Sequence, residues 1–181
     1  MKLGLVGAVG VMAGAGSTAL IARLGRGARP RYRCFSDADA ELVNAICGTI
    51  IPRDDLPGAA ETGAVDYIDR QLGGAFARQR ETYRRGLAAF RETCRRDGSG
   101  FLERDAAGRV AILQAVEAGR VPPDVWRGPS AREFFELVLA HTMQGFYGSP
   151  RHGGNRDYAS YRMLALDYPP VVGRNVIEGK G

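Results

Sequence analysis

The fold class of this chain is decided by one stretch of sequence, AREFFELVLAHTMQGFYGSPRHGGNRDYASYRML, which covers residues 131–164. Its first part holds apolar residues that recur every three or four positions. Such spacing places side chains on one face of an α-helix. We therefore predict a core-facing helix over residues 131–143. The side chains expected on or near its buried side are Phe134, Phe135, Val138, Leu139 and Thr142.

The second part, residues 145–164, is rich in glycine, arginine and aromatic residues. Four glycines, Pro150 and Asn155 crowd into its first half. Glycine allows backbone conformations and close approaches that other residues resist, and Asn tolerates the left-handed region. We predict a long Gly-rich loop that leads into a short helix over residues 158–166.

The composition of this loop indicates a docking surface rather than a reaction centre, because it holds one histidine and no acid–base pair. Aromatic and proline residues would give rigid apolar contact, and arginine, histidine and asparagine would give directional polar contacts. The alternative is that the loop only packs against the helices of its own chain. The residues predicted to contact a partner are Phe146, Tyr147, Pro150, Arg151, His152, Gly153, Gly154, Asn155 and Tyr158.

Four further helical patterns precede this stretch, and no β-alternation persists anywhere. The first is capped by Ser36 and stopped by Pro52, the second follows a loop over residues 53–63, the third covers about 78–96, and the fourth runs from Glu103 or Asp105 to Gly119. The residues expected to face inward are Leu42, Val43, Ile46, Ile50, Val65, Ile68, Leu72, Phe76, Tyr83, Leu87, Phe90, Cys94, Val110, Leu113 and Val116. The sequence thus predicts an all-α protein, a single compact helical domain of about six helices.

The formal charge of +5 is concentrated near the N-terminus. Residues 1–33 contain six basic residues and no acid, so the rest of the chain carries 19 basic residues against 20 acidic ones, a net charge of −1. A protein that binds nucleic acid needs excess positive charge on its folded body. The charge distribution therefore argues against a nucleic-acid partner.

An apolar N-terminal leader occupies residues 1–33. It has no charged residue from Leu3 to Ala22, a length that can span a bilayer as a helix, but its many glycines lower its hydrophobicity. This favours an export signal, with a retained membrane anchor as the alternative. No Arg-Arg pair precedes the apolar run, so a twin-arginine signal is unsupported. The domain organisation that follows is a leader over 1–33 and a helical domain over 34–181.

No catalytic, cofactor-binding or metal site emerges from the remaining residues. His141 and His152 are too far apart for an i, i+4 metal-binding pair, and no cysteine lies at metal-ligand spacing. His141 falls on the apolar helix and is expected to be a core residue. Cys47 and Cys94 are expected on buried helix faces, and a disulfide between them would suit an oxidising compartment.

Two sets of charged residues are expected to lie on solvent-exposed helix faces. Asp66 and Asp69 lie where a solvated helix face would place acidic residues. The arginine-rich segment over residues 78–96 is also expected to form a solvated face, with a docking patch for an acidic partner as the alternative.

Two segments resemble the gluconate 2-dehydrogenase subunit 3 family. They are PRDDLPGAAETGAVDYIDRQL (residues 52–72) and GFYGSPRHGGNRDYASYRMLALDYP (residues 145–169). The resemblance extends over about residues 36–169, and the GSPRHGGN run followed by an aromatic-rich helix is its most specific part. The chain departs from the family pattern because it lacks the arginine pair of a twin-arginine signal.

The resemblance implies a non-catalytic small subunit of a periplasmic, membrane-associated flavoprotein dehydrogenase. A large subunit would bind FAD and oxidise a sugar or sugar acid, and a cytochrome c subunit would pass the electrons onward. The small subunit would help the large one to fold, load FAD, leave the cell interior or remain stable. Two alternatives stay open from the residues themselves: a membrane-anchored helical adaptor unrelated to redox chemistry, and a stand-alone enzyme that uses His152 with an acid such as Asp157.

Overall fold

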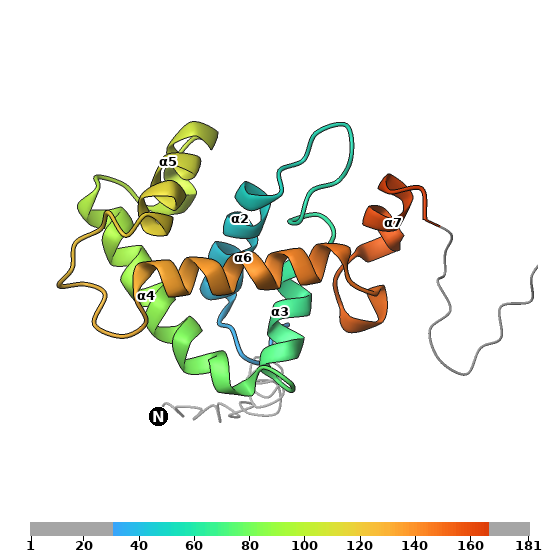
Figure 1. Ribbon diagram of the computed structural model, residues 1–181, viewed down its shortest axis with the longest axis horizontal. Helices are drawn as coiled ribbons and strands as arrows, with labels where there is room; N and C mark the ends of the chain where they lie inside the picture. Colours follow the sequence, from blue (N-terminus) through green and yellow to red (C-terminus); the bar gives the residue numbers. More distant parts are fainter. Residues whose placement is uncertain (1–30, 167–181) are drawn as a thin grey trace, which may run out of the picture. The chain divides into compact units, whose positions relative to one another are not determined.

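The computed structural model describes residues 31–166 of the 181-residue chain (Figure 1). Within that range six α-helices and four short 3₁₀ turns are present and there is no β-strand, which confirms the all-α prediction. The helices are α2 (Asp37–Ile50), α3 (Ala64–Leu72), α4 (Arg80–Arg96), α5 (Ala106–Glu117), α6 (Ala131–Tyr147) and α7 (Ala159–Met163). None of the helices in this range is both long and apolar enough to cross a membrane.

The predicted leader lies outside the described residues except for its last three, Arg31–Arg33. These three belong to the same compact unit as the helices. The backbone N–H of Arg33 donates a hydrogen bond to Asp69 in α3. Arg31–Arg33 are thus connected to the helices, and the division into a leader over 1–33 and a domain over 34–181 stays a prediction.

Helix α6 is the central element of the core. It packs against α2, α3, α4 and α5, and Figure 1 shows it running across the other helices. Its N-terminus is fixed by a capping box in which the Ser130 hydroxyl accepts from the Glu133 N–H and the Glu133 carboxylate accepts from the Ser130 N–H. Phe134, Val138 and Thr142 are buried as predicted, whereas Phe135 is only half-buried.

The apolar stripe predicted on α4 is confirmed, since all four of its side chains are buried: Tyr83, Leu87, Phe90 and Cys94. The stripe predicted on α5 is partly wrong, because Val110 is 42% exposed and Ile112 is buried in its place. Helix α5 begins directly after Asp105, the second of the two predicted starting residues, and the Asp105 carboxylate accepts from the backbone N–H of Gly108. An N-cap carboxylate of this kind satisfies one of the free N–H groups at the start of a helix.

The cysteines are all free thiols, so the disulfide considered between Cys47 and Cys94 is not formed. Cys47 is buried with its Sγ 3.2 Å from the Thr142 Oγ1, and burial raises the pKa of this thiol to about 12. Cys94 is buried in α4, and burial raises the pKa of its thiol to about 11. Both behave as small apolar core residues, as the sequence predicted.

Candidate functional site

The loop that follows α6 begins later than the sequence predicted. Helix α6 continues through Tyr147, and residues 148–158 then form two 3₁₀ turns, Pro150–His152 and Arg156–Tyr158. Gly153 has a φ of 110°. Three non-glycine residues of the loop also have positive φ: Asn155 (46°), Asp157 (55°) and Tyr158 (56°). Such conformations cost free energy in L-residues and persist only where the surroundings enforce them.

Asn155 is the residue that enforces the loop conformation. Its side chain is fully buried, and both ends of its amide are used. The Nδ2 donates to the carbonyl oxygen of Gly148 at 2.9 Å, and the Oδ1 accepts from the backbone N–H of Ser160 at 2.9 Å. One side chain thereby joins the end of α6 to the start of α7.

Gly154 allows the loop to lie directly on α6. A Cβ atom added at this position would overlap the carbonyl oxygen of Gly145, and one added at Gly145 would lie 3.1 Å from the Cα of Ala64 in α3. Glycine at both positions therefore permits three backbones to come together, as residues without a Cβ do in close contacts.

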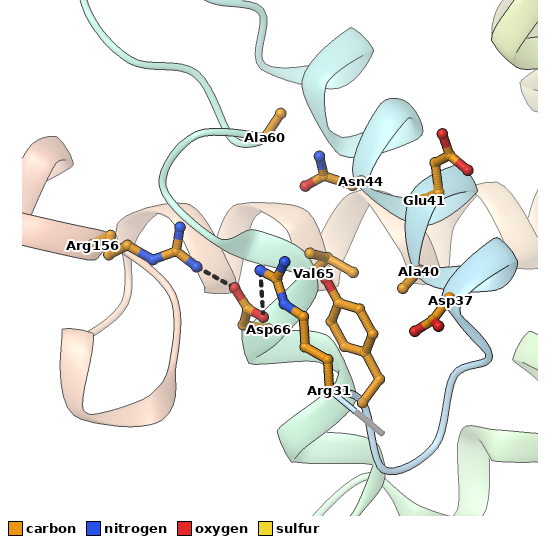
Figure 2. Close-up of a pocket in the computed structure, with 10 residues that line it drawn as sticks. Arg31, Asp37, Ala40, Glu41, Asn44, Ala60, Val65, Asp66 and Arg156 are labelled. Carbon is orange, nitrogen blue, oxygen red and sulfur yellow. Dashed lines mark hydrogen bonds and ion pairs between the residues drawn. The ribbon is translucent and has the colours of Figure 1, made fainter. Parts of the chain in front are cut away.

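Asp66 of α3 ties the loop to the first described residues of the chain (Figure 2). Its carboxylate accepts a hydrogen bond from the Arg156 guanidinium, and its other oxygen lies 3.6 Å from the Arg31 Nη2. The backbone N–H of Arg156 also donates to the Thr62 carbonyl at 2.9 Å. The loop is thus anchored to α3 and to the turn that precedes it.

Asp69, one turn further along α3, holds the segment that leads into α2. Its buried carboxylate accepts three backbone N–H groups, from Arg33 (2.8 Å), Cys34 (2.8 Å) and Phe35 (3.0 Å). The prediction that Asp69 lies on a solvated helix face is wrong. The sequence carried no signal for this role, because the donors are backbone groups more than 30 positions away.

The predicted contact residues divide into a buried and an exposed group. Phe146 is 1% exposed and Asn155 is fully buried, and Gly154 is buried as well. In this conformation these three hold the loop in place, so the contact with a partner expected of them is corrected to a structural role. Tyr147, Arg151 and His152 are exposed, and Pro150, Gly153 and Tyr158 are half-buried. Their contact with a partner stays a prediction.

Exposed apolar side chains that the sequence analysis missed lie in α6 and in and just after α7. Met143 is 41% exposed and lies one helical turn before Tyr147, which is 38% exposed. In α7 and just after it, Met163, Leu164 and Leu166 are 36%, 52% and 49% exposed. The available signal was the i, i+4 spacing of Met143 and Tyr147 on the side of α6 away from its buried stripe.

His152 and Asp157 are not arranged as an acid–base pair. In the part of the chain that the structure describes, His152 Nε2 accepts from Arg151 Nε at 3.1 Å, and no hydrogen bond or ion pair joins it to Asp157. His141 is 3% exposed, with its Nδ1 3.0 Å from the Tyr83 hydroxyl and its ring stacked on Phe76. Burial lowers the pKa of His141 to about 4, so it is a neutral core residue, as predicted.

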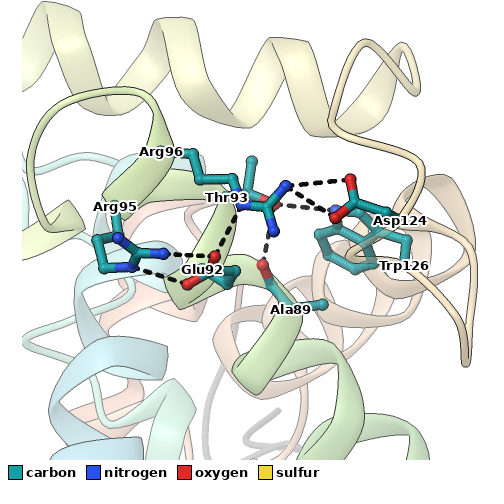
Figure 3. A network of polar contacts seen from close by, with 7 residues as sticks. All are labelled: Ala89, Glu92, Thr93, Arg95, Arg96, Asp124 and Trp126. Atoms are coloured by element: carbon teal, nitrogen blue, oxygen red, sulfur yellow. Dashed lines mark hydrogen bonds and ion pairs between the residues drawn. The ribbon is translucent and has the colours of Figure 1, made fainter.

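Four arginines of α4 are paired with acids of their own chain: Arg84, Arg91, Arg95 and Arg96. Figure 3 shows the last two. Glu92 accepts from Arg95 and Arg96, and these hydrogen bonds lower the pKa of Glu92 to about 2. Arg96 also reaches Asp124. Over residues 31–166 no group of three His, Cys, Asp or Glu side chains is placed to hold a metal ion.

The comparison with protein families supports the resemblance found in the sequence. The family model for gluconate 2-dehydrogenase subunit 3 matches residues 37–167, which include every helix described above and the loop after α6. No curated protein and no solved structure matches the chain. The family model covers well over half of the sequence, and on this evidence the chain belongs to the gluconate 2-dehydrogenase subunit 3 family.

Proposed function

We propose that this chain is the non-catalytic small subunit of a periplasmic, membrane-associated dehydrogenase that oxidises a sugar or sugar acid. The large subunit would hold FAD and carry out the oxidation, and a cytochrome c subunit would accept the electrons. The chain itself would hold no cofactor and would support the folding, FAD loading, export or stability of the large subunit. Membership of the subunit 3 family supports this proposal.

One observation supports docking through the loop after α6. Buried residues hold the backbone of the loop in place, while polar side chains of the loop are exposed. Asn155, Gly154 and Phe146 are buried and fix the backbone, while Arg151 and His152 are exposed. A loop that is already ordered loses little conformational entropy when it binds. Strained backbone held in place by its surroundings is also a common feature of binding surfaces.

The chemistry of the exposed face indicates what it would contact. Met143 and Tyr147 offer apolar surface, and the guanidinium groups of Arg151 and Arg162 are exposed nearby in sequence. Arg70 of α3 donates to the carbonyl oxygen of Arg151, so it adds a third positive charge to the same region. The complementary surface on the large subunit would be an apolar patch with acidic groups at its edge.

Co-purification from cells that produce the whole complex tests this assignment. We expect the double variant Tyr147→Ala, His152→Ala to reduce recovery of the flavoprotein about tenfold, because aromatic anchors dominate interface energies. Both side chains are exposed, so circular dichroism and thermal unfolding of the variant should match the unmodified protein.

A control variant changes exposed residues outside the proposed surface, Leu56→Ala with Arg78→Ala. It should leave recovery of the flavoprotein unchanged. Equal recovery of the flavoprotein with the loop variant and with the control would refute docking through this loop.

A further inference from the structure

A groove runs along the outward face of α2, and at one end it includes the ion-pair group of Arg31, Asp66 and Arg156 described above. It consists of two adjoining hollows, of about 360 Å³ and about 850 Å³, which share Glu41, Asn44 and Ala60. The face of α2 from Asp37 to Thr49 lines them, a length of about 18 Å at 1.5 Å per residue. Figure 2 shows the smaller hollow, between α2, the turn at Ala60 and α3.

The larger hollow has both apolar and charged lining residues. The small residues Ala45 and Gly48 and the larger apolar side chains Leu102 and Val110 line it, together with charged residues that include Glu61, Arg104 and Arg109. Leu102 and Val110 are 40% and 42% exposed, although they sit beside a core that buries most residues of their kind. The helical spacing of α5 predicted that Val110 would be buried. In the structure its side chain lines the groove instead and is exposed.

Charged side chains at both ends of α2 make no hydrogen bond or ion pair within residues 31–166. At the start of α2, Asp37 and Glu41 line the smaller hollow and make no side-chain hydrogen bond or ion pair within residues 31–166. The third carboxylate there, Asp66, is already paired with Arg31 and Arg156. At the far end Arg53 follows α2, and its guanidinium is likewise unpaired within the described chain.

Asn44 lines both hollows. Its Oδ1 is buried and has no hydrogen-bond partner among the described residues. A buried carbonyl oxygen without a donor costs about 1–3 kcal/mol, so it is an unusual feature in a folded protein.

From these observations we propose that the α2 groove binds a polypeptide segment of a partner protein that carries a basic side chain, then apolar side chains. The basic group would lie over Asp37 and Glu41, within reach of the Asn44 amide, and the apolar side chains would cover Leu102 and Val110. The length of the groove suits about three turns of helix, and helix-in-groove binding uses apolar anchors in this way. The inference does not depend on docking through the loop after α6, since Arg156 is the one loop residue that lines the groove.

Site-specific photo-crosslinking in the full-length protein, produced with its natural partners, tests the proposal. A photoreactive phenylalanine analogue at Val110 should form an adduct with one defined partner peptide, read by mass spectrometry. That peptide should contain Lys or Arg beside apolar residues. The same analogue at Leu56, which is 44% exposed outside the groove, should not label it.

Charge variants make the test specific. Glu41→Lys should lower the yield of the adduct about tenfold, because it places like charges together. Glu117→Lys, at an exposed position of α5 outside the groove, should leave the yield unchanged. Replacing the basic residue of the labelled peptide by Glu should restore the yield with Glu41→Lys. Thermal unfolding of each variant checks that it is folded.

Several outcomes would overturn the proposal. They are an adduct with a second copy of this chain, a labelled peptide without a basic residue, equal loss of yield with Glu117→Lys, and no adduct from a complex that remains intact. The last outcome would leave docking through the loop after α6 standing, so failures of the two proposals can be told apart.

Discussion

The imidazole of His141 is buried among aromatic rings, and within residues 31–166 its hydrogen-bond partner is the Tyr83 hydroxyl. Its pKa is lowered to about 4 by burial, from an ordinary value of 6.5. The unfolded chain therefore takes up a proton on this residue at a higher pH than the folded chain does. The free energy of unfolding falls as the pH drops from about 6.5 to about 4, and His141 adds nothing further at lower pH.

We predict that His141→Phe removes this part of the acid sensitivity. Over the full interval the histidine accounts for at most about 3 kcal/mol, since each pKa unit corresponds to about 1.36 kcal/mol. Urea unfolding at pH 7.5 and pH 4.5 should show a smaller difference in the variant than in the unmodified protein. His152→Ala, at an exposed position, should keep the full difference. An unchanged pH dependence in His141→Phe would show that another group is responsible.

At the scale of secondary-structure elements, the packing of α4 against α6 depends on Gly86. A Cβ atom at this position would overlap the ring of Phe134, which is itself buried against Tyr83 and Phe90. Glycine is a poor helix former in isolation. Its presence in the middle of a 17-residue helix is explained by this close contact.

Gly86→Ala sets helix propensity against packing, and we expect packing to win. Alanine would favour the helix by about 1 kcal/mol, but forcing an atom into a filled core costs about 3 kcal/mol. Urea unfolding should therefore show a less stable protein. Gly74→Ala, in the turn after α3, is a control for packing alone, because an added Cβ there meets nothing closer than 3.9 Å. Greater stability in Gly86→Ala would mean that the two helices can separate freely.

The helices could be predicted from sequence because their signals are local. The spacing of Tyr83, Leu87, Phe90 and Cys94 was enough to predict the buried stripe of α4. Pro52 was enough to predict where α2 ends. Val110 could not be placed, since its spacing fits the buried stripe while its surroundings form an open groove. The buried role of Asp69 depends on donors distant in sequence, and the same holds for the contacts of the candidate site.

On the scale of the whole described unit, α3 joins segments from near the two ends of the described residues. Asp69 holds residues 33–35, while Asp66 is shared by Arg31 and Arg156 of the loop after α6. The loop and the segment before α2 are thus linked through two carboxylates one helical turn apart. A change at one of them is expected to reach both segments.

Asp66→Asn should loosen both segments while leaving the fold intact. Partly exposed ion pairs add little to overall stability, so we expect a loss of less than about 1 kcal/mol. Amide hydrogen exchange should become several-fold faster in residues 31–35 and 153–158 and stay unchanged in α4. Asp69→Asn is the comparison, with faster exchange confined to residues 33–36 and a larger loss of about 2 kcal/mol. Protection that is unaltered at 153–158 in Asp66→Asn would disprove the link.

The three hydrogen bonds accepted by Asp69 also limit how many N-terminal residues can be removed without loss of stability. A version that starts at Ser36 would keep the six helices of the described residues, yet it would bury a carboxylate that has lost its three donors. A preparation of the helical unit should therefore retain at least Arg31 onward, six positions before the start of α2.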